Sequence, residues 1–218
     1  MKKIMFNDKF GLTRAVLEGR KTMTRRILKC PRKFRGMEDI ELEFHRLPSL
    51  TSFYYDCVVC DANGYELGQF PPTYEVGDVV AIAQSYHTLN RSGYVAPECF
   101  EHTCEDSAGY ENKMFVKAHL MPNRIRITSL WFERLQDISE EDAMREGIFK
   151  YDKPPLYHEG DMYAPWPPYI KPYKWDVNNL IYRCNARFAF AYLIDKINGG
   201  GTWNSNPWVI AYTFELIR

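Results

Sequence analysis

The sequence predicts an α+β fold, arranged as a small β-barrel with helices on its outside. Short runs with the two-residue periodicity of strands alternate with stretches of helical periodicity, a pattern typical of α+β domains. The chain has 218 residues and no internal repeat, which fits one domain over residues 1–218 with insertions at about 31–75 and 150–174. Its hydrophobic content of 45% is enough for an ordinary soluble core.

Each of the three predicted helices has a start or a stop signal. The first covers residues 10–18 and ends at Gly19, which can adopt the left-handed conformation of a helix C-terminus. The second begins after Ser139, whose hydroxyl can cap the backbone three residues later, and it ends at Gly147. The third runs from about residue 176 to 198, where consecutive glycines stop it.

Three strands are predicted from the remaining periodic segments. Residues 79–83 form an apolar run after a glycine-containing turn, and residues 124–128 alternate between apolar and polar side chains. Residues 208–217 are rich in aromatic and β-branched side chains and are expected to close the sheet. The proline-rich segment 150–174 is long for a loop in a compact domain, so we interpret it as a lid.

The charge of the chain is balanced overall but not locally. The formal net charge is zero, so it does not mark the chain as a nucleic-acid binder. Residues 1–35, however, contain twelve Lys or Arg residues and only two acidic ones, which indicates either a solvated basic face or a phosphate-binding face. No apolar run has the length of a signal peptide or a membrane span, so we expect a cytoplasmic protein with reduced cysteines.

The cysteines give only a weak indication of zinc. Cys57 and Cys60 have the spacing of a ligand pair but lack a glycine-containing knuckle turn, and Cys99 and Cys104 are four residues apart in an acidic loop. We therefore interpret all four as free or buried thiols, and we expect neither a metal site nor a cofactor.

Residues 17–26 contain the strongest concentration of functional side chains. After Gly19 the chain presents four cations and two hydroxyls, namely Arg20, Lys21, Arg25, Arg26, Thr22 and Thr24. Binding an anion or polarising a carbonyl requires such groups, although a basic strand edge that discourages sheet-to-sheet pairing would explain them as well. In one regular strand residues 21 and 24 would face opposite sides, so a shared site requires a turn or bulge between them.

Glu146 is placed against the preference of its predicted helix. A carboxylate in the last helical turn opposes the helix dipole at a cost of roughly 0.3–1 kcal/mol. Residues that break a local rule are sometimes functional and are often merely tolerated, so Glu146 is a candidate that the residue pattern alone does not select.

Residues 19–26, which read Gly-Arg-Lys-Thr-Met-Thr-Arg-Arg, resemble the signature of ASCH domains, especially those of bacteria and phages. Three further blocks agree with this family in order and character, at residues 74–78, 134–148 and 203–209. The resemblance implies a PUA-like fold, which is a small, mostly antiparallel β-barrel with flanking helices and a cleft, and it implies a role with RNA or nucleosides. One bacterial branch hydrolyses the amide of cytidine acetylated on its exocyclic amine.

In that branch, a lysine, a threonine and a glutamate do the chemistry, and they match Lys21, Thr24 and Glu146 of this chain. The resemblance then implies that Lys21 acts as a neutral nucleophile or base, that Glu146 transfers the proton, and that Thr24 orients the substrate or donates to the oxyanion. Five residues are expected to bind the ligand: Arg20, Thr22, Arg25, Arg26 and Trp203. Two alternatives remain open, a non-catalytic RNA-binding module and a protein-interaction module that docks through residues 150–174.

Overall fold

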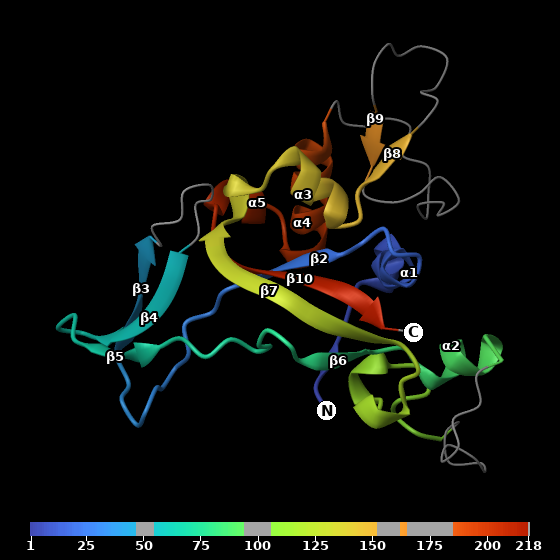
Figure 1. Ribbon diagram of the computed structural model, residues 1–218, viewed down its shortest axis with the longest axis horizontal. Helices are drawn as coiled ribbons and strands as arrows, with labels where there is room; N and C mark the ends of the chain where they lie inside the picture. Colours follow the sequence, from blue (N-terminus) through green and yellow to red (C-terminus); the bar gives the residue numbers. More distant parts are fainter. Residues whose placement is uncertain (47–54, 94–105, 152–161, 165–184, 218) are drawn as a thin grey trace.

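The computed structural model describes residues 1–46, 55–93, 106–151, 162–164 and 185–217, and its centre is one twisted, mostly antiparallel sheet (Figure 1). The strand order along this sheet is β1-β6-β7-β10-β2. β1 pairs with β6 in parallel, and every other neighbouring pair is antiparallel. The strands are β1 (Lys3–Ile4), β6 (Val79–Ile82), β7 (Arg124–Arg134), β10 (Trp208–Ile217) and β2 (Met23–Ile27).

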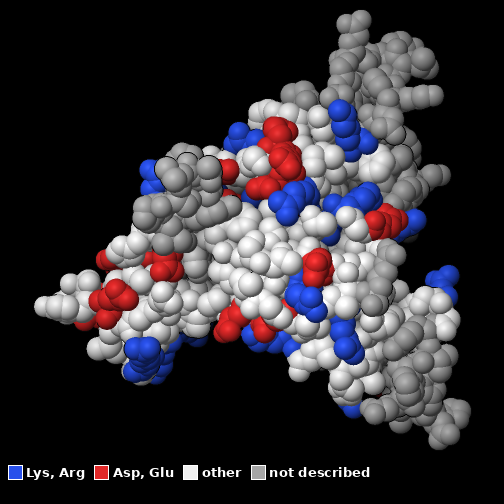
Figure 2. All heavy atoms as spheres, in the orientation of Figure 1, with Lys and Arg blue, Asp and Glu red and all other residues white. Residues whose placement is uncertain are grey.

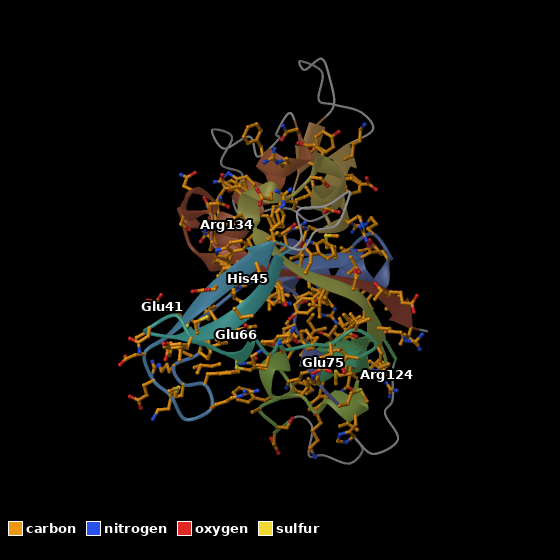
Figure 3. All side chains as sticks on the ribbon, turned by 60° about the vertical axis from the view of Figure 1, so that its left-hand side comes forward. Glu41, His45, Glu66, Glu75, Arg124 and Arg134 are labelled. Carbon is orange, nitrogen blue, oxygen red and sulfur yellow. The ribbon has the colours of Figure 1, made fainter. Side chains whose placement is uncertain are left out.

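A three-stranded extension branches from β7 and occupies the predicted insertion at residues 31–75. It contains β3 (Ile40–Arg46), β4 (Tyr55–Asp61) and β5 (Glu66–Gln69), and β4 meets β7 at the pair of residues 55 and 132. Figure 3 labels three side chains of this extension: Glu41 and His45 on β3, and Glu66 on β5. These strands lie apart from β2. The α+β class is thus confirmed. Among the described strands β1 and β2 end the path without pairing to each other, so closure into a barrel is not seen there.

Most helices are short. Helices α3, α4 and α5 pack together on one side of the main sheet (Figure 1). The α-helices are α1 (Leu12–Leu17), α2 (Tyr86–Arg91), α3 (Glu140–Arg145), α4 (Ala186–Asn198) and α5 (Thr202–Ser205). Single 3-10 turns occur at Asp8–Phe10, Lys113–Phe115, Ala118–Leu120 and Leu135–Asp137. A small hairpin follows α3 and pairs β8 (Phe149–Tyr151) with β9 (Met162–Ala164).

The predicted helix signals are confirmed for α1 and α3. Gly19 follows α1 with a φ of 75°, and Gly147 follows α3 with a φ of 101°, values that favour glycine over other residues. At the start of α3, the Ser139 side chain accepts a hydrogen bond of 3.0 Å from the backbone N–H of Asp142.

The start predicted for the third helix, near residue 176, lies outside the described residues, but a helix that runs without interruption from there to residue 198 is contradicted at Asn185. α4 begins at Ala186, because Asn185 is extended and its side chain accepts a hydrogen bond from the N–H of Phe188. The first residues of the apolar pattern that suggested a start near residue 176 fall within residues 165–184, which lie outside the described part of the chain. The segment interpreted as a lid, 150–174, also falls largely outside it.

The main core lies between the sheet and helices α1, α3 and α4. Buried side chains from each of these elements form one cluster, for example Val16, Ile127, Ala143, Phe190 and Tyr212. Full burial of a large apolar side chain contributes about 1.5–3 kcal/mol. This packing fixes the end of α1, the start of β2 and the end of α3 relative to one another, and the candidate site lies where they meet.

Candidate functional site

Lys21 lies in the connection between α1 and β2, before the strand begins. The backbone N–H groups of Arg20 and Lys21 both donate to the carbonyl of Ala15, at 2.9 and 3.0 Å, which holds the chain in a turn after Gly19. β2 starts at Met23, so the alternation of a regular strand governs the direction of Thr24 but not that of Lys21, which lies before the strand. The turn precedes Lys21, and the backbone N–H of Phe214 in β10 donates to the carbonyl of Thr22 at 2.9 Å, so the pairing with β10 already includes Thr22.

The structure brings Lys21 and Glu146 together. The Lys21 Nζ lies 2.5 Å from Oε2 of Glu146 and 2.7 Å from its backbone carbonyl oxygen. Only 2% of the Lys21 side chain and 5% of the Glu146 side chain are exposed. Glu146 caps the C-terminus of α3, where its carboxylate is offset by this ammonium group, so its unfavourable position in the helix is compensated by tertiary contacts.

The environment of Lys21 lowers the pKa of its amine. Burial is the largest cause, because it penalises the charged form, and the guanidinium groups of Arg26 and Arg25 add to it. The Glu146 carboxylate opposes this effect through its charge and its hydrogen bond. An amine with a lowered pKa and a carboxylate in direct contact can exchange a proton, which is the chemistry expected of a general base.

Arg25 is enclosed by carboxylates instead of facing a ligand. Its guanidinium group donates to Glu133 at 2.5 Å, to Asp142 at 3.1 Å and to Oε1 of Glu146 at 3.3 Å. The Arg25 side chain has no exposed surface, and the nearby carboxylates hold its pKa above its usual range against the opposing effect of burial. The prediction that Arg25 binds a ligand is therefore not supported, since its donors are used within the protein.

The two carboxylate oxygens of Glu146 contact two different cations. Oε2 contacts Lys21, and Oε1 contacts Arg25. The pair Lys21–Glu146 is thus the inner end of a buried network that continues through Arg25 to Glu133 and Asp142. The Glu133 carboxylate has a raised pKa because of its burial, although Arg25 and the indole N–H of Trp131 act in the other direction.

Thr24 lies on the sheet face opposite to Arg25. It pairs with Tyr212 across β2 and β10, and directly opposed residues share one face of a sheet. Thr24 is only 4% exposed, and its hydroxyl forms no hydrogen bond with another part of the described chain. A largely buried hydroxyl without an internal partner is available to a ligand that reaches it.

Arg20 and Thr22 have local partners. Arg20 forms an ion pair of 2.7 Å with Glu18, and its guanidinium carbon lies 5.8 Å from the ring centre of Phe149. The hydroxyl of Thr22 accepts a hydrogen bond of 3.3 Å from Arg145. These contacts stabilise the turn after α1.

Arg26 lines a surface pocket with a volume of about 360 Å³. The pocket lies on the same sheet face as Thr24 and includes Tyr74, Tyr212 and Phe70 in its wall. The ring centre of Phe6 lies 5.8 Å from the Arg26 guanidinium carbon and 5.8 Å from the Lys21 amine. The pocket and the buried Lys21–Glu146 pair therefore share one aromatic neighbour.

Trp203 belongs to the helical layer. It packs edge-on against Phe190 of α4, with ring centres 6.4 Å apart, and its carbonyl accepts a hydrogen bond from Gln136. It does not line the pocket that contains Arg26. These contacts give no support to the prediction that it binds the ligand.

Some of the basic residues of the N-terminal segment have acidic neighbours in the folded protein. Figure 2 shows Lys and Arg side chains interspersed with Asp and Glu over the face in view. Several of these cations are paired with carboxylates, among them Lys2, Arg14 and Lys33. The local excess of basic residues seen in the sequence is thus partly neutralised by folding.

Cys57 and Cys60 do not form a metal-ligand pair. They are three residues apart in β4, and in a strand such residues face opposite sides. Both are buried free thiols, and burial raises the pKa of Cys57 to about 12. No group of three or more His, Cys, Asp or Glu residues with metal-binding geometry exists among the residues that the structure describes, and Cys99 and Cys104 lie outside them.

Residue patterns missed the acidic partners of Arg25 and the aromatic wall of the pocket. Glu133 has one sequence signal, because it shares a face of β7 with Trp131 at the end of an otherwise apolar run. Tyr74 and Tyr212 contact each other edge-on at 5.5 Å from segments far apart in the chain, so no local pattern could have paired them.

Comparison with known proteins adds no relative to this description. A scan against protein-family models, a search of curated proteins and a search of solved structures all returned no match. Within the described segments, no helix is long and apolar enough to cross a membrane.

Proposed function

We propose that the chain is an ASCH-type, PUA-like protein that binds a nucleoside or RNA and hydrolyses the amide of an acylated cytidine. The observation that carries this proposal is the 2.5 Å contact between the Lys21 amine and the Glu146 carboxylate, in an environment that lowers the pKa of Lys21. The hydroxyl of Thr24 has no partner among the described residues and lies on the sheet face of the neighbouring pocket, opposite to the face on which Arg25 contacts Glu146, so it is available to a ligand that enters from the pocket. The order of the ASCH-like sequence blocks supports the choice of substrate.

In the proposed reaction, the Lys21 ammonium first transfers a proton to the Glu146 carboxylate with which it is paired, and the amine becomes neutral. The neutral amine accepts a proton from water, and the hydroxide attacks the acyl carbonyl carbon. The hydroxyl of Thr24 donates to the oxyanion that forms. As the bond between the carbonyl carbon and the exocyclic nitrogen breaks, the Lys21 ammonium returns a proton to that nitrogen, which yields a carboxylic acid and cytidine; the acid then releases its proton to the solvent.

Incubation of the purified protein with N-acetylated cytidine, followed by chromatographic separation of cytidine and acetate, tests the proposal. We expect turnover that is abolished in Lys21→Ala and reduced at least about a hundredfold in Thr24→Val, which removes one oxyanion donor. Thr24→Val is the sharper variant, because the hydroxyl has no internal partner and its loss leaves the fold intact. Arg126→Gln, on the exposed surface of β7, is the matched control. Absence of turnover, or turnover unchanged in both site variants, would contradict the proposal.

A non-catalytic RNA-binding role is the second candidate, and the burial of the pair favours it. With 2% and 5% of their side chains exposed, Lys21 and Glu146 form a complete ion pair that resembles a structural one. In this case binding of single-stranded RNA would weaken steeply with salt and with Arg26→Ala, whereas Lys21→Ala would affect stability more than affinity. Salt-insensitive or absent binding would exclude this role.

A further inference from the structure

The charged residues that the structure describes in the lining of the pocket beside Arg26 are all basic. Among the described residues that line it, three are cations, Lys3, Arg26 and Lys29, and none is acidic. Its volume of about 360 Å³ falls within the range of roughly 300–1,000 Å³ that is typical of small-molecule sites. The remaining wall is largely apolar and aromatic, with Phe70 and Tyr212 as its largest rings.

The positive charges of this pocket are not neutralised within the part of the chain that is described. The Lys3 amine donates to the backbone carbonyls of Met114 and Val116, at 2.6 and 2.7 Å, and Arg26 donates to the carbonyl of Met5 at 2.7 Å. Carbonyl oxygens satisfy hydrogen bonds but carry no net charge.

Lys29 is exposed and forms neither an ion pair nor a hydrogen bond with any described residue. Three uncompensated cations around one concave surface focus a positive potential into it.

The neighbouring cation Arg25 has a different electrostatic environment from Arg26. Arg25 and Arg26 are neighbours in β2 and point to opposite faces of the sheet. Arg25 meets three carboxylates within 3.3 Å, whereas Arg26 meets none in the segments that the structure describes. The protein therefore neutralises the cation on one face and leaves the cation on the pocket face for an external anion.

We propose that this pocket binds the phosphate of a nucleotide, so that the preferred ligands are phosphorylated nucleosides and not free nucleosides. A phosphate monoester carries up to two negative charges and accepts hydrogen bonds from several cations at once, which matches Lys3, Arg26 and Lys29. The aromatic and apolar wall accommodates the sugar and the edge of the base. The inference names the substrate class of the proposed function and rests on it for the nucleoside part of the ligand.

Calorimetric titration with cytidine, cytidine 5′-monophosphate and inorganic phosphate tests this inference without requiring any turnover. We expect the monophosphate to bind at least about tenfold more tightly than cytidine at low salt, since only the phosphate forms charge-assisted hydrogen bonds with the pocket cations. We expect this advantage to shrink as salt is added. Equal affinity for cytidine and its monophosphate would overturn the inference.

Matched variants separate the pocket from general surface charge. Lys29→Gln should remove most of the phosphate advantage without affecting the fold, because Lys29 has no ion pair or hydrogen bond with a described residue to lose. Arg26→Gln should do the same, and Arg126→Gln on β7, outside the pocket, should leave the advantage unchanged. An equal loss in Arg126→Gln would overturn the inference.

The outcomes for the inference and for the proposed function are distinguishable. Tight phosphate-dependent binding without amide hydrolysis would support the pocket and contradict the catalytic proposal. Hydrolysis of acetylcytidine with no gain from a 5′-phosphate in either binding or turnover would support catalysis and overturn the phosphate subsite.

Discussion

Replacing Glu146 with glutamine removes the charge that faces the buried Lys21 amine and keeps the shape of the side chain. The amide oxygen can still accept a hydrogen bond from Lys21, whereas the negative charge that opposes the effect of burial is lost. Because burial is the largest cause that lowers the pKa of Lys21, the substitution should lower that pKa further. The folded protein must then hold Lys21 either as an unpaired buried ammonium or as a neutral amine.

Both alternatives lead to a similar loss of stability at neutral pH. An unpaired charge left by breaking a buried ion pair costs about 3–5 kcal/mol. Deprotonating an ordinary lysine at pH 7 costs about 5 kcal/mol, because each pKa unit is worth about 1.4 kcal/mol. If the variant holds Lys21 as a neutral amine, its loss of stability cannot exceed this value. At pH 9 this limit falls to about 2 kcal/mol. We therefore expect Glu146→Gln to lose about 3–5 kcal/mol at pH 7 and about 2 kcal/mol at pH 9.

The sign of this pH dependence follows from proton linkage. The Lys21 pKa is lower in the folded state than its ordinary value of 10.5, so the unfolded state binds more protons between the two values. Stability rises with pH across that window in both proteins, but the window of the variant extends to lower pH, where the wild-type Lys21 is still protonated, so the deficit of the variant becomes smaller as pH rises.

Urea unfolding followed by tryptophan fluorescence at pH 7 and pH 9 measures the free energy of unfolding directly. The double variant Lys21→Met/Glu146→Gln is the control, and it should recover most of the loss because no unpaired lysine remains. The reasoning fails if Glu146→Gln costs less than about 1 kcal/mol at pH 7, if the deficit is larger at pH 9, or if the double variant is no more stable than the single one.

Three further predictions concern the network and the helix that hold this pair. Arg25→Met should lower the free energy of unfolding by about 3–5 kcal/mol at pH 7, because it leaves buried carboxylates without a counter-charge. The loss should be smaller at pH 5, where protonation removes part of this uncompensated charge, and equal losses at both pH values would contradict the network. Ser139→Ala should lose about 1 kcal/mol of unfolding free energy by removing the hydrogen bond to the N–H of Asp142, and a neutral result would show that the cap is dispensable. Gly147→Ala should lose about 1–3 kcal/mol, since a Cβ at a φ of 101° is strained and would lie 3.4 Å from the Cβ of Lys21; an unchanged melting temperature would argue against this.

Local signals in the sequence determined where several elements begin and end. Ser139 and Gly147 mark both ends of α3, and Gly19 marks the end of α1, because capping and left-handed turns depend on residues only a few positions apart. The aromatic and β-branched run at the C-terminus predicted β10 with its observed bounds, Trp208–Ile217. The α+β class followed from these periodicities.

The role of each cation was decided only by the tertiary structure. Arg25 and Arg26 are identical residues in adjacent positions, and no local pattern distinguishes them. Folding places Glu133 and Asp142, more than a hundred residues away, around Arg25, and it leaves Arg26 beside a pocket without an acidic residue among its described lining. The sequence segment 19–26 marked where cations concentrate, and the packing of α3 against β2 determined which of them stay charged, paired or open to a ligand, since electrostatic energies depend on distances between groups that are remote along the chain.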